Sequence, residues 1–539
     1  MNAEDHEDPA DYVWDSGDVV DIELNWDSIT VDPAGAATVA GSKVTVTSAG
    51  NYRITGSLAD GQVVVNTDDE ETVRLILNSV DIHCDESSPI YIEDAKKVVI
   101  VLQTGTVNYV SDGGSYFLEP DTDEPNAAIF SKSDLTIYGD GSLSVDANYN
   151  DGVASKDGLI IKSGIIDVSS VDDGVRGKDY LVIKGGSITL DVGGDGFKSD
   201  NDADITRGYV SVENGTISIT ADRDAIEAQT DVIVTGGELT LTSGGGSNGF
   251  VGPDISAKGI KGLVSVIFNG GTVTADCADD AVHSNMNITV NGGSFTISTG
   301  DDAFHADTYL IINGGTINIL ESYEGLESSV VTINDGYIHL ESSDDGINIA
   351  GGNDDEPADP FAPPDEGMWL HINGGYIVVS SGGDGIDSNG FMDMSGGTVI
   401  VNGPDTWDPA IDYGFGDFNI TGGTLVAVGS SSMAQGPGEN STQYSVHIKL
   451  DSEKTPMLIH LSTPSGEVFT FMPTKPFQSI VYSSPQLAPG SHSLYLGGSH
   501  TGTPTDGLYE GGTYTQGTLE ESFTITNIVT TIGGGGWWP

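Results

Sequence analysis

Acidic residues recur at one fixed place in a four-residue motif, Asp-[Gly/Ala]-apolar-X, in which Glu once replaces Asp. Neighbouring copies are commonly 21 or 22 residues apart. The copies begin at Asp151, Asp173, Asp195, Asp224, Asp280, Asp302, Glu324, Asp345 and Asp384. In a repeated fold this spacing stacks the carboxylates about 5 Å apart, where they repel one another and raise one another's pKa. The motif therefore indicates a cation between the carboxylates.

Ca²⁺ suits this donor set, because it accepts Asp side chains, backbone carbonyls and waters in flexible geometry. In four copies a second Asp precedes the first, so that adjacent residues offer two ligands. We predict several Ca²⁺ ions, with ligands drawn from Asp151, Asp172, Asp173, Asp195, Asp224, Asp279, Asp280, Asp301, Asp302, Asp344, Asp345 and Asp384. The alternative is that Asp-Gly simply forms the turn and its carboxylate caps backbone N–H groups.

The charge balance restricts the classes of partner. The chain has 81 acidic and 19 basic residues, a net charge of −62, and no Lys or Arg between Lys261 and Lys449. Phosphate would be repelled, which argues against nucleic acid and against an anionic membrane surface. Three accounts of the acidity remain: a salt-rich habitat, the binding of many cations, or a solvated surface with no specific role.

Basic residues gather in a short part of the chain. Lys156, Arg176, Lys178 and Lys198 fall at related positions of three consecutive motif copies. They form a ladder of cations paired with the Asp residues, a patch that meets carboxylates or hydroxyls of an extended polysaccharide, for which Arg is suited, or both. His283 and His305 continue the same positions, and we interpret them as ladder residues because no Ser or Cys partner accompanies them.

The elements that position these residues are strands. Twelve segments follow one pattern, as in KDYLVIKGGSITL from Lys178 and TDVIVTGGELTLT from Thr230: an alternating apolar run, a Gly-rich turn and a second alternating run. The turn glycines supply the positive φ of a sharp bend. A period near 22 residues fits one short coil of three strands. The sequence thus predicts an all-β fold, a right-handed parallel β-helix forming a single-stranded solenoid.

Composition shifts divide the chain. Residues 1–60 are predicted to be a β cap over the open end of the helix. The helix follows over residues 61–435, interrupted by loops at about 111–127, 243–259 and 351–367. Residues 440–530 have longer strands and are predicted to form a small β module, and residues 531–539 a flexible tail.

Targeting and redox signals are few. Cys84 and Cys277 lie on distant coils, so we predict two packed thiols and no disulfide framework. No apolar run has the length of a transmembrane segment, and we expect no membrane insertion. The start MNAEDHED does not have the pattern of a signal peptide. Composition leaves two addresses open, an exported chain after signal removal or an intracellular protein.

Several runs carry a resemblance to a known family. They include AAIFSKSDLTI, NYNDGVASKDGL, VDDGVRGKDYLVI and GGDGFKSDN. Over about residues 20–530 the chain resembles bacterial and archaeal carbohydrate-binding domain proteins. The resemblance implies a pectate-lyase-like β-helix, bound calcium, attachment to cellulose and acidic plant-wall polysaccharides without cleavage, and an extracellular or cell-surface location. It implies calcium at Asp151, Asp173 and Asp195, with Lys156, Arg176, Lys178 and Lys198 around them.

Three functions from different classes follow. The first is a calcium-stabilised, non-catalytic polysaccharide-binding protein, with no catalytic residues. Its sugar rings would stack on aromatic faces drawn from Tyr149, Tyr180, Tyr209, Tyr309, Tyr323, Tyr337 and Tyr376. The second is a pectate-lyase-like enzyme, in which Ca²⁺ acidifies a proton beside a uronate carboxylate and Arg176 is the base. The third is a rigid adhesin or scaffold.

Overall fold

The chain is built almost entirely of β-strands. The computed structural model describes residues 1–118, 122–252, 255–351 and 365–533. Among them the single helical element is a 3₁₀ turn, η1 (Pro9–Tyr12), and no helix is long and apolar enough to cross a membrane. Two compact units divide the chain, Met1–Ser284 and Asn285–Pro539, and each is described by itself.

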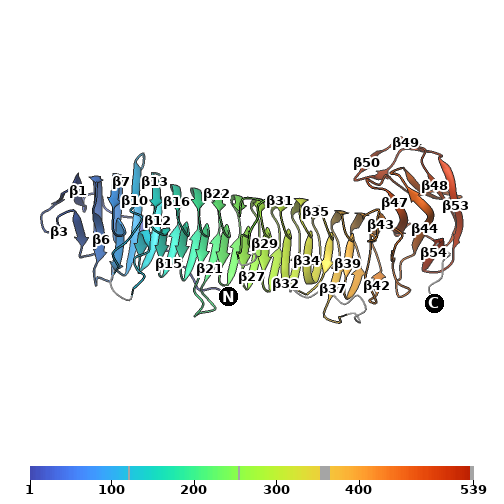
Figure 1. The fold of residues 1–539 in the computed structure, drawn as a ribbon, viewed down its shortest axis with the longest axis horizontal. Helices are drawn as coiled ribbons and strands as arrows, with labels where there is room; N and C mark the ends of the chain where they lie inside the picture. Colours follow the sequence, from blue (N-terminus) through green and yellow to red (C-terminus); the bar gives the residue numbers. More distant parts are fainter. Residues whose placement is uncertain (119–121, 253–254, 352–364, 534–539) are drawn as a thin grey trace. The chain divides into compact units, whose positions relative to one another are not determined.

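In the first unit, from β8 (Ile90–Asp94) to β26 (Ile260–Gly262), each strand pairs in parallel with the third strand after it, which makes three ladders (Figure 1). The β12 ladder contains β9 (Lys97–Leu102), β12 (Asp134–Gly139), β15 (Gly158–Ile161), β18 (Tyr180–Ile183) and β21 (Tyr209–Val212). The β13 ladder contains β13 (Ser142–Ala147), β16 (Ile165–Ser170), β19 (Ser187–Val192) and β22 (Thr216–Ala221). The β14 ladder contains β14 (Asp151–Ser155), β17 (Val175–Gly177), β20 (Phe197–Ser199), β23 (Ile226–Ala228), β26 (Ile260–Gly262) and β29 (Val282–Ser284).

The parallel register stacks identical positions of successive repeats. Leu159 lies beside Leu181, and Leu181 beside Val210, all of them fully buried. The turns require glycine both because φ is positive and because a side chain would collide with the backbone of the preceding repeat. Gly186 has φ 108°, and a Cβ there would lie 2.9 Å from the carbonyl oxygen of Gly164 in the preceding repeat. The apolar alternation in the sequence therefore becomes continuous columns of buried side chains.

The second unit repeats the same order of strands. β32 (Phe304–Ile312), β34 (Leu326–Ile333), β36 (Ile347–Ile349), β37 (Trp369–Ile372), β39 (Ile386–Ser388) and β40 (Phe391–Met394) carry the motif positions and the strands that follow them. The C-terminal part adds an antiparallel sheet of six strands in the order β50-β51-β46-β45-β48-β53. Its core contains Phe469, Phe471 and Phe477.

Two boundaries differ from the predicted ones. β1 (Val20–Trp26) pairs in parallel with β5 (Gly50–Leu58), and β5 with β7 (Val73–Cys84), so stacked strands begin inside the predicted cap of residues 1–60. β54 (Val529–Gly533) pairs with β44 (Ser445–Lys454), so residues 531–533 are a strand and not a tail. Residues 534–539 lie outside the described residues. In both places backbone pairing extends past the point at which the repeat pattern fades from the sequence.

The segment before β1 also lies elsewhere than predicted. Residues 3–12, which we call the strap, run along the side of the β12 ladder instead of over an end. The Ala3 N–H donates to the Thr206 carbonyl at 2.7 Å, and Lys97 Nζ donates to the His6 carbonyl at 2.8 Å. The two cysteines are free and buried, as the sequence predicts.

Candidate functional site

Several motif Asp residues use one carboxylate oxygen to cap the backbone of the next repeat. The Asp195 N–H donates to Asp173 Oδ1 at 3.0 Å, and the Asp224 N–H donates to Asp195 Oδ1 at 3.0 Å. In the second unit the Glu324 N–H donates to Asp302 Oδ1 at 3.0 Å. The alternative reading of the motif, a turn with a capping carboxylate, thus describes one oxygen of these residues. The second carboxylate oxygen is the one that can face a cation, as Asp195 Oδ2 faces Lys198.

In the first unit that cation is a side chain. Arg176 donates to Asp151 Oδ2 at 2.7 Å, and Lys198 lies 2.5 Å from Asp195 Oδ2. Lys261 pairs with Asp224 at 3.2 Å. Because Asp151 is 1% exposed, its charge would be costly without this partner. The metal ligands predicted at these repeats are therefore already neutralised by neighbouring Arg and Lys side chains.

A further lysine, Lys258, stands where the other repeats have the motif Asp. Lys258 occupies the first motif position in the sequence Lys258-Gly-Ile-Lys261, and its N–H donates to Asp224 Oδ1 at 2.7 Å. Its Nζ lies 2.6 Å from Asp279 and 2.7 Å from Asp280. This repeat does not fit the pattern Asp-[Gly/Ala], although the spacing of Gly259 from the neighbouring motifs marks it as a copy.

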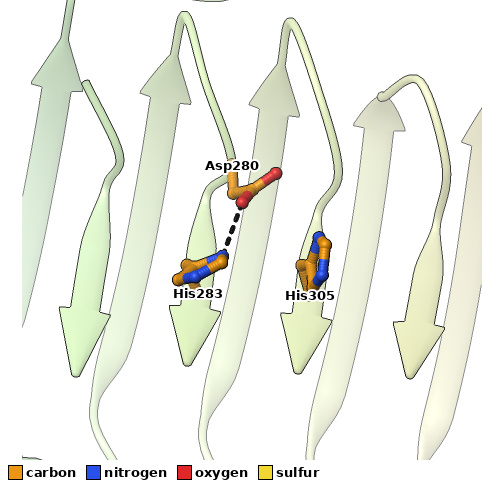
Figure 2. Close-up of side chains that lie close together, drawn as sticks. All are labelled: Asp280, His283 and His305. Carbon is orange, nitrogen blue, oxygen red and sulfur yellow. Dashed lines mark hydrogen bonds and ion pairs between the residues drawn. The ribbon is translucent and has the colours of Figure 1, made fainter. Parts of the chain in front are cut away.

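In the first unit a histidine follows Lys261 in the register of the β14 ladder. His283 forms a hydrogen bond with Asp280 Oδ2 at 2.8 Å (Figure 2). Within the second unit, His305 is 4% exposed and lies 3.2 Å from Asp302 and 3.5 Å from Glu327. Both histidines contact carboxylates of their own column, which is the arrangement expected of ladder residues.

Further along the second unit three carboxylates converge without any Lys or Arg in the sequence nearby. One oxygen from each of Asp345, Asp384 and Asp387 lies within 4.8 Å of the other two. Burial, followed by the charge of Asp345, raises the pKa of Asp384 to about 9. Burial and neighbouring Asp residues raise the pKa of Asp345 and of Asp387 to about 7. We call these three residues the carboxylate cage.

A proline explains why the cage has an unpaired oxygen. The Gly385 N–H donates to the Pro409 carbonyl, which places Pro409 at the motif position of the next repeat. Proline has no N–H, so nothing caps Asp384, and its Oδ1 is buried with no hydrogen-bond partner among the described residues. The sequence Pro409-Ala-Ile-Asp412 is thus a further motif copy, with Pro replacing Asp.

Asn348 offers a second unpaired oxygen beside the cage. It lies next to Asp387 in the β36–β39 register. Its amide nitrogen donates to Glu324 at 2.8 Å, whereas its Oδ1 is buried and accepts no hydrogen bond in the described part of the chain. Asn348 is 9% exposed. An all-oxygen group of carboxylates and one amide is the set that a hard cation such as Ca²⁺ prefers. These residues fit the predicted ion.

The four predicted polysaccharide-binding cations separate into two columns. Arg176 and Lys198 are register partners and both pair with motif Asp residues. Lys156 and Lys178 follow Ser155 and Gly177, which are register partners in the β14 ladder. Lys156 pairs with Glu124 at 2.6 Å and its side chain is 36% exposed. The four residues therefore do not form one open patch.

The seven tyrosines predicted to stack on sugars differ in whether their rings are accessible. Tyr180 and Tyr209 stack on each other under the strap and are 6% and 5% exposed. Tyr149 stacks on Tyr116, and Tyr337 stacks on Tyr376. Only two of the seven tyrosines, Tyr309 and Tyr323, are about half exposed and have no aromatic stacking partner among the described residues. Tyr323 lies on the strand connection beside the cage, since the Asp344 N–H donates to its carbonyl at 2.9 Å.

Comparison with known proteins supplies the family. The family model of the carbohydrate-binding domain-containing proteins matches residues 40–303. A carbohydrate-binding domain-containing protein of Acetivibrio thermocellus is 37% identical over 157 residues, which are 29% of this chain and 55% of that protein. The chain thus matches about half the length of this curated relative.

One solved structure is also similar in sequence. It is a gadolinium derivative of the polysaccharide lyase-like protein from C. thermocellum, 32% identical, covering 48% of this chain and 94% of that chain with a TM-score of 0.40. Over residues 40–303, where it matches the family model, the chain belongs to the family of carbohydrate-binding domain-containing proteins.

Proposed function

We propose that the protein is a non-catalytic, calcium-binding protein that attaches to acidic polysaccharide. Its scaffold is a right-handed parallel β-helix of the pectate-lyase-like kind, formed by the three ladders. The observation that carries the calcium part is the carboxylate cage, in which a buried Asp384 oxygen and the Asn348 oxygen have no donor among the described residues. The family match supports carbohydrate as the ligand.

Asp345, Asp384, Asp387 and Asn348 are the residues that would hold Ca²⁺. When bound, the ion supplies a positive charge that offsets the repulsion among buried carboxylates and offers open positions to a sugar carboxylate. Tyr323, half exposed beside the cage, offers an apolar ring to a sugar. A chain with a net charge of −62 would otherwise repel an acidic polymer, so the cation links the two.

The alternative function, a polysaccharide lyase, has less support, because the surroundings of Arg176 do not suit a catalytic base. The guanidinium of Arg176 pairs with Asp151 and Asp200, and 15% of the side chain is exposed. Burial opposes the charge of Arg176, but Asp151 and then Asp200 raise its pKa above the usual value. A base must give up its proton, which these pairs disfavour. We therefore propose binding without cleavage, at the cell surface or outside the cell, with cellulose and polygalacturonate of plant cell walls as ligands.

Two measurements test the proposal. Titration of the chelated protein with Ca²⁺ in a calorimeter should give saturable binding that Asp384→Asn weakens at least tenfold. Sedimentation with insoluble cellulose, and affinity electrophoresis in polygalacturonate, should retain the protein much more strongly when Ca²⁺ is present than under chelation. Absence of calcium binding would reject the cage as a metal site. Release of unsaturated sugar products that Arg176→Ala abolishes would reject the non-catalytic assignment.

A further inference from the structure

The outer face of the β12 ladder combines apolar and aromatic side chains. Ile160, Val182, Tyr180 and Tyr209 form a cluster on it, and the rings of the two tyrosines stack at 5.4 Å. These residues point away from the buried columns that fill the interior, where Leu159 and Leu181 lie. Open to solvent, this face would present stacked rings of the kind that contact sugars.

Basic residues border the same face. Lys162 and Lys184 follow the register partners Ile161 and Ile183, and Lys97 opens the neighbouring strand β9. Arg74 lies on the neighbouring strand β7, where it is the register partner of Val99 on β9. The first unit therefore contains a basic and aromatic face, which we call the covered face, in a chain that has only 19 basic residues in total.

The strap occupies this face with its own carboxylates. Glu7 lies 2.8 Å from Lys162 and 2.9 Å from Lys184, and Asp5 lies 2.7 Å from Lys184. Asp11 lies 2.8 Å from Lys97. Although burial opposes it, hydrogen bonds from Lys162 and Lys184 lower the pKa of Glu7 to about 2. Glu7 is thus held as a carboxylate against the lysines.

Besides these ion pairs, hydrogen bonds of His6 to Tyr180 and Thr136 and the ring contact of Tyr12 with Tyr138 hold the strap. It contains five acidic residues and no Lys or Arg, and its regular structure is the four-residue turn η1. Its backbone contacts to the ladder come from a few donors, among them Lys97 and Arg74, which donate to strap carbonyls. A separate chain that bears carboxylates could make the same ionic contacts.

We propose that the strap stands in for a carboxylated polysaccharide, and that the covered face binds such a polymer when the strap is displaced. The proposal rests on the proposed function for the class of ligand, but not on the carboxylate cage, because the cations here are lysines. Since the strap is tethered, its effective concentration is high, and it competes with any polymer for the face. Its removal should therefore strengthen polymer binding.

The test compares matched full-length variants in affinity electrophoresis through polygalacturonate. Excess chelator is present, so that Ca²⁺ cannot link two acidic polymers. Asp5→Asn combined with Glu7→Gln removes the carboxylates that meet Lys162 and Lys184. We expect this pair to bind about tenfold more tightly than the parent, in line with the loss of a tethered competitor. Asp15→Asn with Asp18→Asn removes the same charge from exposed residues just beyond the strap, and should change the affinity little.

A disulfide provides a second, reversible comparison. Ala3→Cys with Thr206→Cys joins two residues that are linked through their backbones, while Cys84 and Cys277 stay buried. The oxidised protein should lose polygalacturonate binding and the reduced protein should regain it. Lys162→Gln with Lys184→Gln, added to the strap variant, should abolish the gain.

The outcomes separate the two proposals. If the strap variant stays folded by its melting curve and binds no more tightly than the Asp15/Asp18 control, the strap is a structural clamp and the inference is wrong. If the parent still binds cellulose or polygalacturonate through Ca²⁺ in that case, the proposed function stands. Calcium-dependent binding that is lost while lysine-dependent binding persists would instead overturn the cage and keep the covered face.

Discussion

At the scale of single residues, the first motif position decides where the counter-charge comes from. Arg176, Lys198 and Lys261 neutralise the motif carboxylates of the first unit from within the chain. Around Asp384 the corresponding positions hold Asn348, Asp387 and Asp412, which bring no positive charge. The same backbone pattern thus produces an internally paired column in one part of the sequence and an electron-rich cage in another.

Asp384→Asn should have opposite effects in two conditions. Without divalent cations the substitution removes a carboxylate that is costly to ionise, because burial and the charge of Asp345 raise its pKa to about 9. The free energy of unfolding should therefore increase by about 1–3 kcal/mol, and the melting temperature should rise with it. With Ca²⁺ the substitution removes a ligand, so the calcium-dependent rise in melting temperature should shrink. Differential scanning calorimetry checks both. Asp451→Asn, at an exposed position, is the control, and a parallel change in both variants would contradict the cage.

Arg176→Ala should destabilise the protein strongly. Asp151 would keep a buried charge without a partner, which costs about 3–5 kcal/mol. Because the vacated position then resembles the cage, Ca²⁺ should restore part of the loss, whereas Arg176→Lys should lose less and respond less to Ca²⁺. Chemical denaturation with and without Ca²⁺ measures this. A loss below 1 kcal/mol in Arg176→Ala would show that the pair contributes little.

At the scale of elements, the sequence predicts the strands well and their counter-charges poorly. The strands can be predicted from the period-two alternation and the turn glycines, because every second side chain of a strand enters a buried column that accepts only apolar residues. The local pattern around Asp151 and Asp384 is nearly the same, so only the partner contributed by a different repeat, Arg176 or Pro409, distinguishes an ion pair from an unpaired oxygen. The strap was missed because its partners, such as Lys184, are about 180 residues away in sequence.

Acid should release the strap. His6 is buried against Thr136 and Tyr180, and burial followed by Lys97 lowers its pKa to about 4. Because that pKa lies below the unfolded value of about 6.5, docking is fully favoured above pH 6.5 and weakens as the pH falls from 6.5 to 4. Glu7, with a pKa of about 2, adds a contribution that is lost between about pH 4.5 and 2.

Hydrogen exchange of peptides covering residues 3–12 measures this release across the pH range, after correction for the intrinsic exchange rate. The other charged groups facing His6 are Asp5, Asp11, Lys184 and Asp134. Burial raises the pKa of Asp134 to about 6, so it titrates in the opposite sense. His6→Gln should remove the loss of protection between pH 6.5 and 4. Protection that stays constant down to pH 4 in the parent would contradict the assigned role of His6.

At the scale of the whole molecule, a net charge of −62 opposes the folded state unless cations are bound or built in. The first unit carries its cations as side chains, and the cage region of the second unit does not. Chelation should therefore act unevenly. It should lower the melting temperature by several degrees and reduce hydrogen-exchange protection in residues 324–349 and 376–412 more than in residues 151–200. Equal loss of protection in both regions would contradict an ion at the cage.

Lys258 and Pro409 occupy the motif position of their repeats, yet the neighbouring strands keep their parallel register. Stacking therefore does not depend on which residue begins the motif, whereas the charge at that repeat does. The number of bound ions and the length of the repeat array are consequently separable properties. If the cage binds Ca²⁺ as proposed, substitutions such as Pro409→Asp or Lys258→Asp should change the metal stoichiometry one repeat at a time while the scaffold retains its dimensions.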